Sequence, residues 1–243
     1  MCGYYNHSLS KMKDFFSSKI LRLFLCLFLI ISPLTINAQT PQELQAKIDS
    51  LKKVLVTLTD TARVDCLYEI GVQYLCKSNK DSALYYTNIV YQGAKKLSYK
   101  HGFAIAYLLK ALTTNCYYNN FSEAEHLVHE AIKWFELTPN KKEIPMAYWL
   151  LGRVQTNQSN YDEALNNLAL SMEWAKRIGE EKAKGNVLET MTDIYRDQGE
   201  YVKLLETQQE LIQMDRASGN DGYYYFHELW VLGLMYRLLE EYS

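Results

Sequence analysis

The stretch Tyr148-Trp149-Leu150-Leu151-Gly152, followed by Tyr161-Asp162-Glu163-Ala164-Leu165, is the fullest copy of a pattern that recurs along the chain. The recurring positions are 41, 40, 40 and 41 residues apart, and they are occupied by Lys80, Phe121, Tyr161, Tyr201 and Tyr242. Each of these residues is predicted to mark the turn between two helices. A fixed period of this length is typical of a stacked helical array. Such arrays usually bind other chains along a groove, so the pattern favours an interaction module over an enzyme.

Each copy also places a small or medium residue on both of its helices. On the first helix the position is occupied by Gly71, Leu112, Gly152, Thr192 and Gly233. Twelve residues later the second helix presents Ala83, Ala124, Ala164 and Leu204. Small residues at these places let the two backbones of a pair approach closely, while larger neighbours interlock with the next pair.

The segment before the first copy, residues 39–60, predicts a capping helix. Thr40 is a suitable N-cap, Pro41 stands at the first helical position, and Glu43 completes a capping box. Leu44, Ile48, Leu51 and Leu55 then form one apolar stripe that suits the open end of the array. Asp60 is the expected N-cap of the helix that follows.

The amino terminus, residues 1–38, has the three-part layout of a secretory signal peptide. Basic side chains precede the apolar run Leu23–Ile31, and Ile36-Asn37-Ala38 offers a cleavage site after Ala38. Nine uninterrupted apolar residues fall short of the roughly 20 that span a bilayer, so a retained anchor is the weaker reading. Translation from Met12 instead of Met1 would give a more ordinary signal length. We expect an exported protein, periplasmic or secreted.

The charge of the mature chain argues against nucleic-acid binding. The whole sequence has a formal net charge of −2, and 22 basic and 27 acidic residues remain after Ala38. A net charge of −5 offers no basic surface for phosphates. Membrane contact is expected only through an uncleaved signal or a span beyond Ser243.

No motif for catalysis, cofactor or metal binding is recognisable. The sequence lacks a Gly-rich phosphate loop, a zinc-protease helix and a Gly-x-Ser-x-Gly elbow. His126 and His129 lie three apart, but two histidines alone do not make a metal site, and their places predict a solvated face. We therefore expect no catalytic residues, no cofactor and no metal.

Three cysteines remain after the signal segment. Cys66 and Cys76 are ten residues apart on one predicted helix, about 15 Å along its axis, which is too far for a disulfide. A bridge between Cys76 and Cys116 stays open, because successive first helices are expected to lie side by side. Three small buried thiols are the alternative.

The repeat resembles the tetratricopeptide repeat, whose signature is an aromatic residue or Leu, then Leu-Gly, a Tyr, and later Ala, an aromatic residue and Ala. The resemblance covers residues 62–242 and is best in the copy that begins at Tyr148. It implies an all-α, right-handed helical-repeat solenoid over residues 61–243, with four helix pairs and the first helix of a fifth. The period near 40 exceeds the family's usual 34. Long-period repeats of this kind are similar to exported input regions of bacterial two-component sensors.

The resemblance also implies a concave groove lined by the first helices. Carried over to this sequence, the groove positions are Tyr68, Val72, Leu109, Thr113, Trp149, Arg153, Glu189, Asp193, Arg196, Trp230, Leu234 and Arg237. Trp, Tyr and Arg often anchor interfaces, so a peptide or protein segment is the expected ligand. Core packing of Trp149 and Trp230 is the competing explanation.

The fifth copy stops at its turn, which leaves the apolar side of its first helix uncovered. We therefore expect a non-catalytic, sensory-input module at the front of a longer protein. A free secreted or periplasmic scaffold, a fragment of a sensor histidine kinase, and self-association through the fifth repeat are the alternatives.

Overall fold

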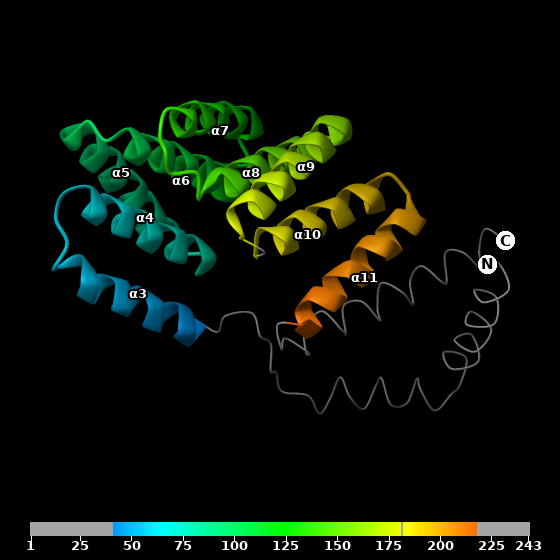
Figure 1. The fold of residues 1–243 in the computed structure, drawn as a ribbon, viewed down its shortest axis with the longest axis horizontal. Helices are drawn as coiled ribbons and strands as arrows, with labels where there is room; N and C mark the ends of the chain where they lie inside the picture. The colour runs from blue at the N-terminus through cyan, green and yellow to red at the C-terminus, as the bar shows by residue number, and fades with distance from the viewer. Residues whose placement is uncertain (1–40, 181, 218–243) are drawn as a thin grey trace, which may run out of the picture. The chain divides into compact units, whose positions relative to one another are not determined.

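A computed structural model describes residues 41–180 and 182–217 of the chain, and these residues form helices with no strand among them (Figure 1). The all-α class predicted from the sequence is therefore confirmed for this part of the chain. The helices belong to one compact unit, Gln39–Gly219. In chain order they are α3 (Pro41–Leu55), α4 (Asp60–Cys76), α5 (Lys80–Leu97), α6 (Lys100–Tyr118), α7 (Phe121–Glu136), α8 (Ile144–Asn157), α9 (Tyr161–Ile178), α10 (Lys182–Asp197) and α11 (Tyr201–Ala217).

Helices that follow one another in the sequence pack side by side. The pairs α4–α5, α6–α7, α8–α9 and α10–α11 are in close contact. The second helix of each pair begins at Lys80, Phe121, Tyr161 or Tyr201, and these are the four positions predicted to mark the turns. The period of about 40 residues is thus a structural period. Tyr242 and the rest of the fifth copy lie outside the described residues.

The four turns share one backbone conformation. Two residues before each second helix, the chain is left-handed at Ser78 (φ 55°), Asn119 (φ 49°), Ser159 (φ 62°) and Gly199 (φ 71°). At three of the turns the next amide donates back to a carbonyl five residues earlier, for example Asn160 N–H to Gln155 O at 2.9 Å. This is the Schellman arrangement that ends a helix by satisfying its last carbonyl groups. Asn79 and Asn120 then cap the following helices with their side chains.

Close approach within the pairs depends on the predicted small residues. Ala83, Ala124 and Ala164 are fully buried. At Gly152, an added Cβ would lie 2.8 Å from Leu168 Cγ and 3.0 Å from the Ala164 carbonyl oxygen. The backbones of α8 and α9 are therefore too close for a side chain at this position.

Gly152→Ala is expected to lower the free energy of unfolding by about 1–3 kcal/mol, because the new methyl group meets a backbone atom that cannot rotate away. Gly185→Ala is the matched control: Gly185 is also helical, but nothing lies within 4 Å of its added Cβ. There, the better helix propensity of alanine should raise stability by up to about 1 kcal/mol. Urea denaturation followed by circular dichroism measures both changes, and equal effects would contradict the close approach.

Helix α3 begins at Pro41, as predicted, and packs on α4 with Leu44 and Ile48 buried. Leu51 and Leu55 pack against the small apolar cluster that includes Ile70. The prediction for Asp60 is wrong by one residue. Thr59 is the N-cap of α4, and Asp60 is the first helical residue, with a left-handed φ of 51° and no role as a side-chain cap.

The main core runs through α4 to α8, and its largest fully buried side chains include Phe135, Ile105, Leu108 and Leu150. The first helices lie beside one another in the pairs α4–α6 and α8–α10, whereas α6 and α8 share few contacts. The connection between α7 and α8, residues 137–143, is longer than the turns inside the pairs. Its residues Asn140 and Glu143 contact His101 on α6.

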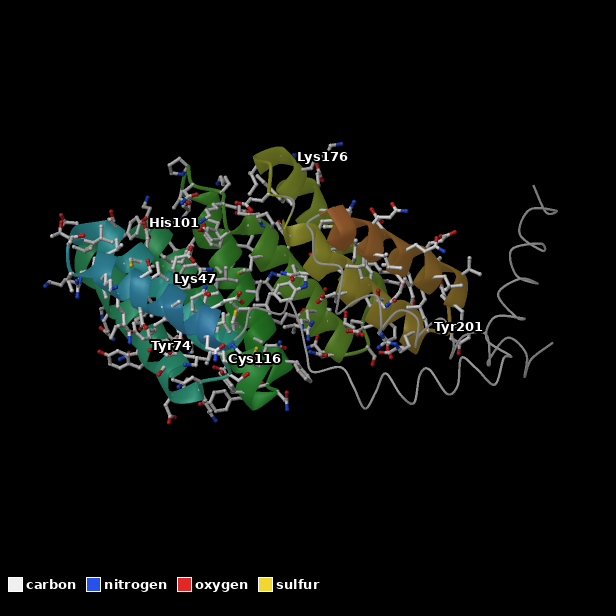
Figure 2. All side chains as sticks on the ribbon, turned by 90° about the horizontal axis from the view of Figure 1, so that it is seen from below. Lys47, Tyr74, His101, Cys116, Lys176 and Tyr201 are labelled. Carbon is white, nitrogen blue, oxygen red and sulfur yellow. The ribbon has the colours of Figure 1, made fainter. Side chains whose placement is uncertain are left out.

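The three cysteines of the described region are free thiols. Cys66 is buried, as predicted, but the prediction of burial is wrong for Cys76 and for Cys116, which is labelled near the end of α6 in Figure 2. Both are exposed because they lie in the last turns of their helices, beyond the packed part of each pair. None of the helices described between residues 41 and 217 is both long and apolar enough to cross a membrane.

Candidate functional site

The predicted groove residues on α4 and α6 are mostly interior. Tyr68, Leu109 and Thr113 are 4%, 0% and 1% exposed, and Val72 is partly buried against the main core. Tyr68 and Leu109 therefore lie in the core, whereas Thr113 also lines a cavity between α5 and α6. Leu109 is buried because Gly71 lacks a side chain: Leu109 Cδ2 lies 2.7 Å from the place where a Cβ of residue 71 would stand.

Thr113 faces the neighbouring pair. Its hydroxyl lies 3.3 Å from the Thr87 hydroxyl on α5 and donates to the Leu109 carbonyl at 2.7 Å. Tyr68 reaches across to α8, where its hydroxyl lies 3.7 Å from Met146 Sδ. Both side chains therefore join elements of the fold to one another.

The predicted residues on α8 and α10 come together at a surface. A cavity of about 320 Å³ lies between the C-terminal parts of these helices. Its lining includes Arg153, Asp193 and Arg196 from the predicted set, with Tyr161 and Asp197 beside them. Arg196 Nη1 lies 2.8 Å from Asp193 Oδ1, and the Tyr161 hydroxyl donates to Asp197 at 3.4 Å. We call this the α8–α10 cavity.

Trp149 joins the two helices next to this cavity. Its indole N–H donates to the Asn186 carbonyl oxygen at 2.9 Å and to the Thr190 hydroxyl at 3.0 Å. The Arg153 guanidinium lies over the indole ring, with Cζ 5.8 Å from the centroid. Trp149 is partly buried and packs against the main core, so it contributes both to the core and to the surface beside the cavity. Glu189, also predicted, is half-buried on the same helix as Asp193.

The α8–α10 cavity offers charged hydrogen-bonding groups of both signs. The guanidinium groups of Arg153 and Arg196 can donate hydrogen bonds to carboxylates or carbonyl oxygens. The carboxylates of Asp193 and Asp197 can accept hydrogen bonds from amides or ammonium groups. Among residues 41–217 as described, no group of three His, Cys, Asp or Glu side chains is arranged to hold a metal ion. His126 and His129 are both exposed, as predicted for a solvated face. Trp230, Leu234 and Arg237 lie outside the described residues.

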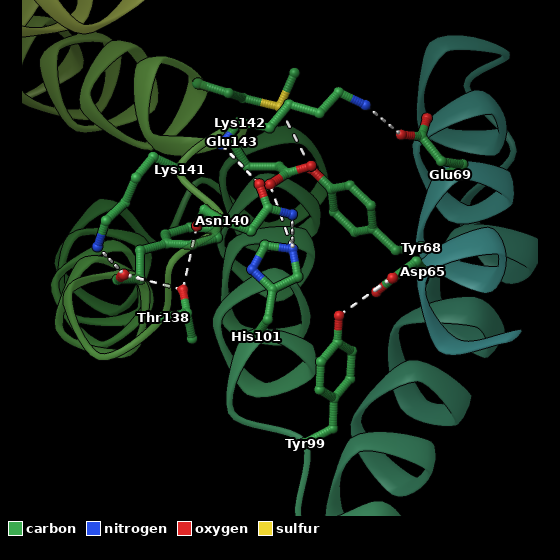
Figure 3. A network of polar contacts seen from close by, with 12 residues as sticks. Asp65, Tyr68, Glu69, Tyr99, His101, Thr138, Asn140, Lys141, Lys142 and Glu143 are labelled. Carbon is green, nitrogen blue, oxygen red and sulfur yellow. Dashed lines mark hydrogen bonds and ion pairs between the residues drawn. The ribbon is translucent and has the colours of Figure 1, made fainter. Parts of the chain in front are cut away.

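A second polar cluster was not predicted from the sequence. It joins α4, the start of α6 and the α7–α8 connection, as Figure 3 shows. The Asn140 amide nitrogen lies 3.1 Å from His101 Nε2, and Glu143 Oε2 lies 3.4 Å from the same nitrogen. On the other side, the Tyr99 hydroxyl donates to Asp65 at 3.2 Å. We call these residues, with Tyr68, Glu69 and Lys142, the connection cluster.

The side chains of the connection cluster have shifted pKa values. Burial raises the pKa of the Glu143 carboxyl to about 7, and the Glu69 and Asp65 carboxylates add to this, while Lys142 opposes it. Burial lowers the pKa of the His101 imidazole, and Lys142 lowers it further. Burial also raises the pKa of Asp65 and of the Tyr68 and Tyr99 hydroxyls.

His101 and Glu143 lie within ion-pair distance, but their pKa shifts both favour the neutral forms. We describe them as a neutral contact, since both side chains are nearly buried, at 6% and 12% exposure, and burial disfavours either charge. Asn140 can donate to Nε2 when the imidazole proton is on Nδ1. Lys142 Nζ lies 3.5 Å from Glu69 Oε1, which ties the connection to α4.

The sequence matches no protein-family model, and no curated protein matches it.

Proposed function

We propose that this chain is a non-catalytic interaction module that binds a peptide or protein segment at the α8–α10 cavity. The observation that supports this most directly is the meeting of Arg153, Asp193 and Arg196 around one cavity. The resemblance to the tetratricopeptide repeat implies a ligand groove at the same three positions. Arginine and tryptophan are both enriched at the energetic centres of interfaces.

The proposal also covers the fold family, the export and the role of the chain in a longer protein. The chain is a right-handed, tetratricopeptide-type solenoid, exported after removal of residues 1–38, and it acts as a sensory-input module of a longer protein. The 40-residue period, the small residues inside the pairs and the repeated turns support the family. The sequence features of residues 1–38 support export. A ligand would signal by binding one arrangement of the helices better than another.

An acidic side chain of the peptide would bind at Arg153, because Arg196 is already paired with Asp193. Arg153 lies over the Trp149 ring, so its side chain is already oriented before a ligand arrives. A guanidinium can then form two parallel hydrogen bonds to one carboxylate. Trp149 itself is a poor residue to test, because its removal would also break the contacts to Asn186 and Thr190.

The test uses a library of random dodecapeptides displayed on phage and panned against the full chain. For a selected peptide, Arg153→Ala is expected to weaken binding about 30-fold, the effect of losing one central interface residue of about 2 kcal/mol. Isothermal titration calorimetry measures the dissociation constant of each variant.

Arg177→Ala is the matched control. Arg177 also lies over a tryptophan, with Cζ 5.1 Å from the Trp174 ring, but it is on α9 and does not line the cavity. Its removal should leave the affinity unchanged. Selection of no peptide, or equal weakening in both variants, would count against binding at this cavity.

A further inference from the structure

A larger cavity, of about 610 Å³, lies between α5 and α6 and opens to solvent. It shares no lining residue with the α8–α10 cavity. Its volume is in the range of sites that hold small molecules. We call it the α5–α6 cavity.

Three tyrosines contribute to the wall of this cavity: Tyr91, Tyr107 and Tyr118. Tyr91 contacts Tyr107 edge to face, with centroids 6.2 Å apart, and makes a second edge contact with Phe103 at 5.9 Å. Phe103 in turn stacks on Trp134 at 5.0 Å. These contacts fix the orientation of the rings before a ligand binds. Lys80 Nζ lies over the Tyr118 ring, 4.3 Å from its centroid, and Tyr118 is 52% exposed.

The polar part of the lining is electrically balanced. Lys110 and Glu123 are its charged residues, and they pair at 3.7 Å. The hydroxyls of Thr87 and Thr113 already donate to carbonyl groups of their own helices. The exposed amide side chains of Asn88 and Gln92 remain at the rim, with donors and acceptors in the same group.

We propose that the α5–α6 cavity binds an uncharged saccharide. The C–H faces of a sugar ring are apolar and carry slight positive charge, so they stack on the negative faces of tyrosine rings. The sugar hydroxyls both donate and accept, which matches the amides of Asn88 and Gln92. A charged ligand would find no uncompensated opposite charge beside the Lys110–Glu123 pair. A wholly apolar ligand would cover these polar groups without replacing their hydrogen bonds to water.

The test probes the full chain against an array of neutral di-, tri- and tetrasaccharides, with acidic oligosaccharides as comparators. A neutral sugar that binds is then titrated by calorimetry. We expect Tyr91→Ala to weaken its binding about tenfold, because the loss of one ring contact of about 1.4 kcal/mol corresponds to that factor. Asn88→Ala changes an exposed side chain without touching the core, and should weaken binding by loss of a hydrogen bond even if Tyr91→Ala disturbs the fold.

Tyr85→Ala is the control, because Tyr85 is 61% exposed on the same helix and does not line the cavity. It should leave sugar binding unchanged, and so should Arg153→Ala, which separates this site from the peptide site proposed above. The proposal is overturned if no neutral sugar binds at millimolar concentration or if acidic sugars are preferred. Equal affinity of wild type, Tyr91→Ala and Asn88→Ala would also overturn it.

Discussion

Phe135→Ala is expected to lower the free energy of unfolding by about 3–5 kcal/mol, the usual result of removing a buried aromatic ring. Phe135 is fully buried in the last turn of α7, and its ring lies 5.6 Å from the His101 imidazole. In the same turn, the Phe135 carbonyl accepts hydrogen bonds from Thr138 Oγ1 at 3.0 Å and from Lys141 Nζ at 2.6 Å. Loss of the ring therefore leaves a cavity beside the connection cluster. Urea denaturation followed by circular dichroism measures the change.

Leu137→Ala is the control for this substitution. Leu137 is two residues further along the chain, and its side chain is 61% exposed. Its truncation should change stability by no more than about 0.5 kcal/mol. Similar losses in the two variants would show that Phe135 does not fill the core as described.

Glu143→Gln should raise the free energy of unfolding relative to the wild type at pH 8. The gain at pH 8 should exceed that at pH 5 by about 3 kcal/mol. Glu143 has a folded-state pKa raised from 4.5 to about 7, so the folded state holds a proton that the unfolded state has lost. Its contribution to stability is present below pH 4.5 and disappears as the pH rises through 7. Each pKa unit corresponds to about 1.4 kcal/mol. Glutamine keeps the shape of the neutral acid and cannot ionise.

His101 acts in the opposite direction. Its folded pKa is lowered, so its contribution is present above the unfolded value near 6.5 and is lost as the pH falls through the folded pKa. Asp65, whose folded pKa is raised, acts in the same direction as Glu143 at lower pH. Comparing the variant with the wild type at each pH removes the part of these two contributions that does not depend on the Glu143 charge.

Urea denaturation at half-unit steps between pH 5 and pH 8 checks the Glu143 result. Glu136→Gln serves as the control, because Glu136 is an exposed carboxylate at the end of α7. Its curve should run parallel to that of the wild type. If Glu143→Gln also gave a parallel curve, the Glu143 carboxyl would not be buried in the folded state.

The periodic features of the fold could be predicted from the sequence because each repeat carries its own copy of the signal. The turns before α5, α7, α9 and α11 were predicted from the spacing, and the alanines of the second helices from their place twelve residues after the small or medium residue of the first helix. The Asn side chains that cap α5 and α7 were also visible, at Asn79 and Asn120, one residue before the marked positions.

The connection cluster could not be predicted, because its members are far apart in sequence and meet only once. Asp65, His101 and Glu143 belong to three different segments, and no repeat position is common to them. The groove prediction treated the first helices as equivalent. They differ because Gly71 admits Leu109 into the space between pairs, whereas Trp149 bonds across to Asn186 on α10 and has the Arg153 guanidinium over its ring.

The sparse contact between α6 and α8 bears on how the chain comes apart. In a repeat array, cooperativity passes from one unit to the next through the surface they share. The first two pairs are joined by both α4–α6 and α5–α6 contacts, whereas the second and third are joined chiefly through α7 and α8. Local opening should therefore begin at the boundary between α7 and α8, where ionisation of Glu143 weakens the same boundary. Alkaline conditions would then divide one cooperative unit into two that melt separately.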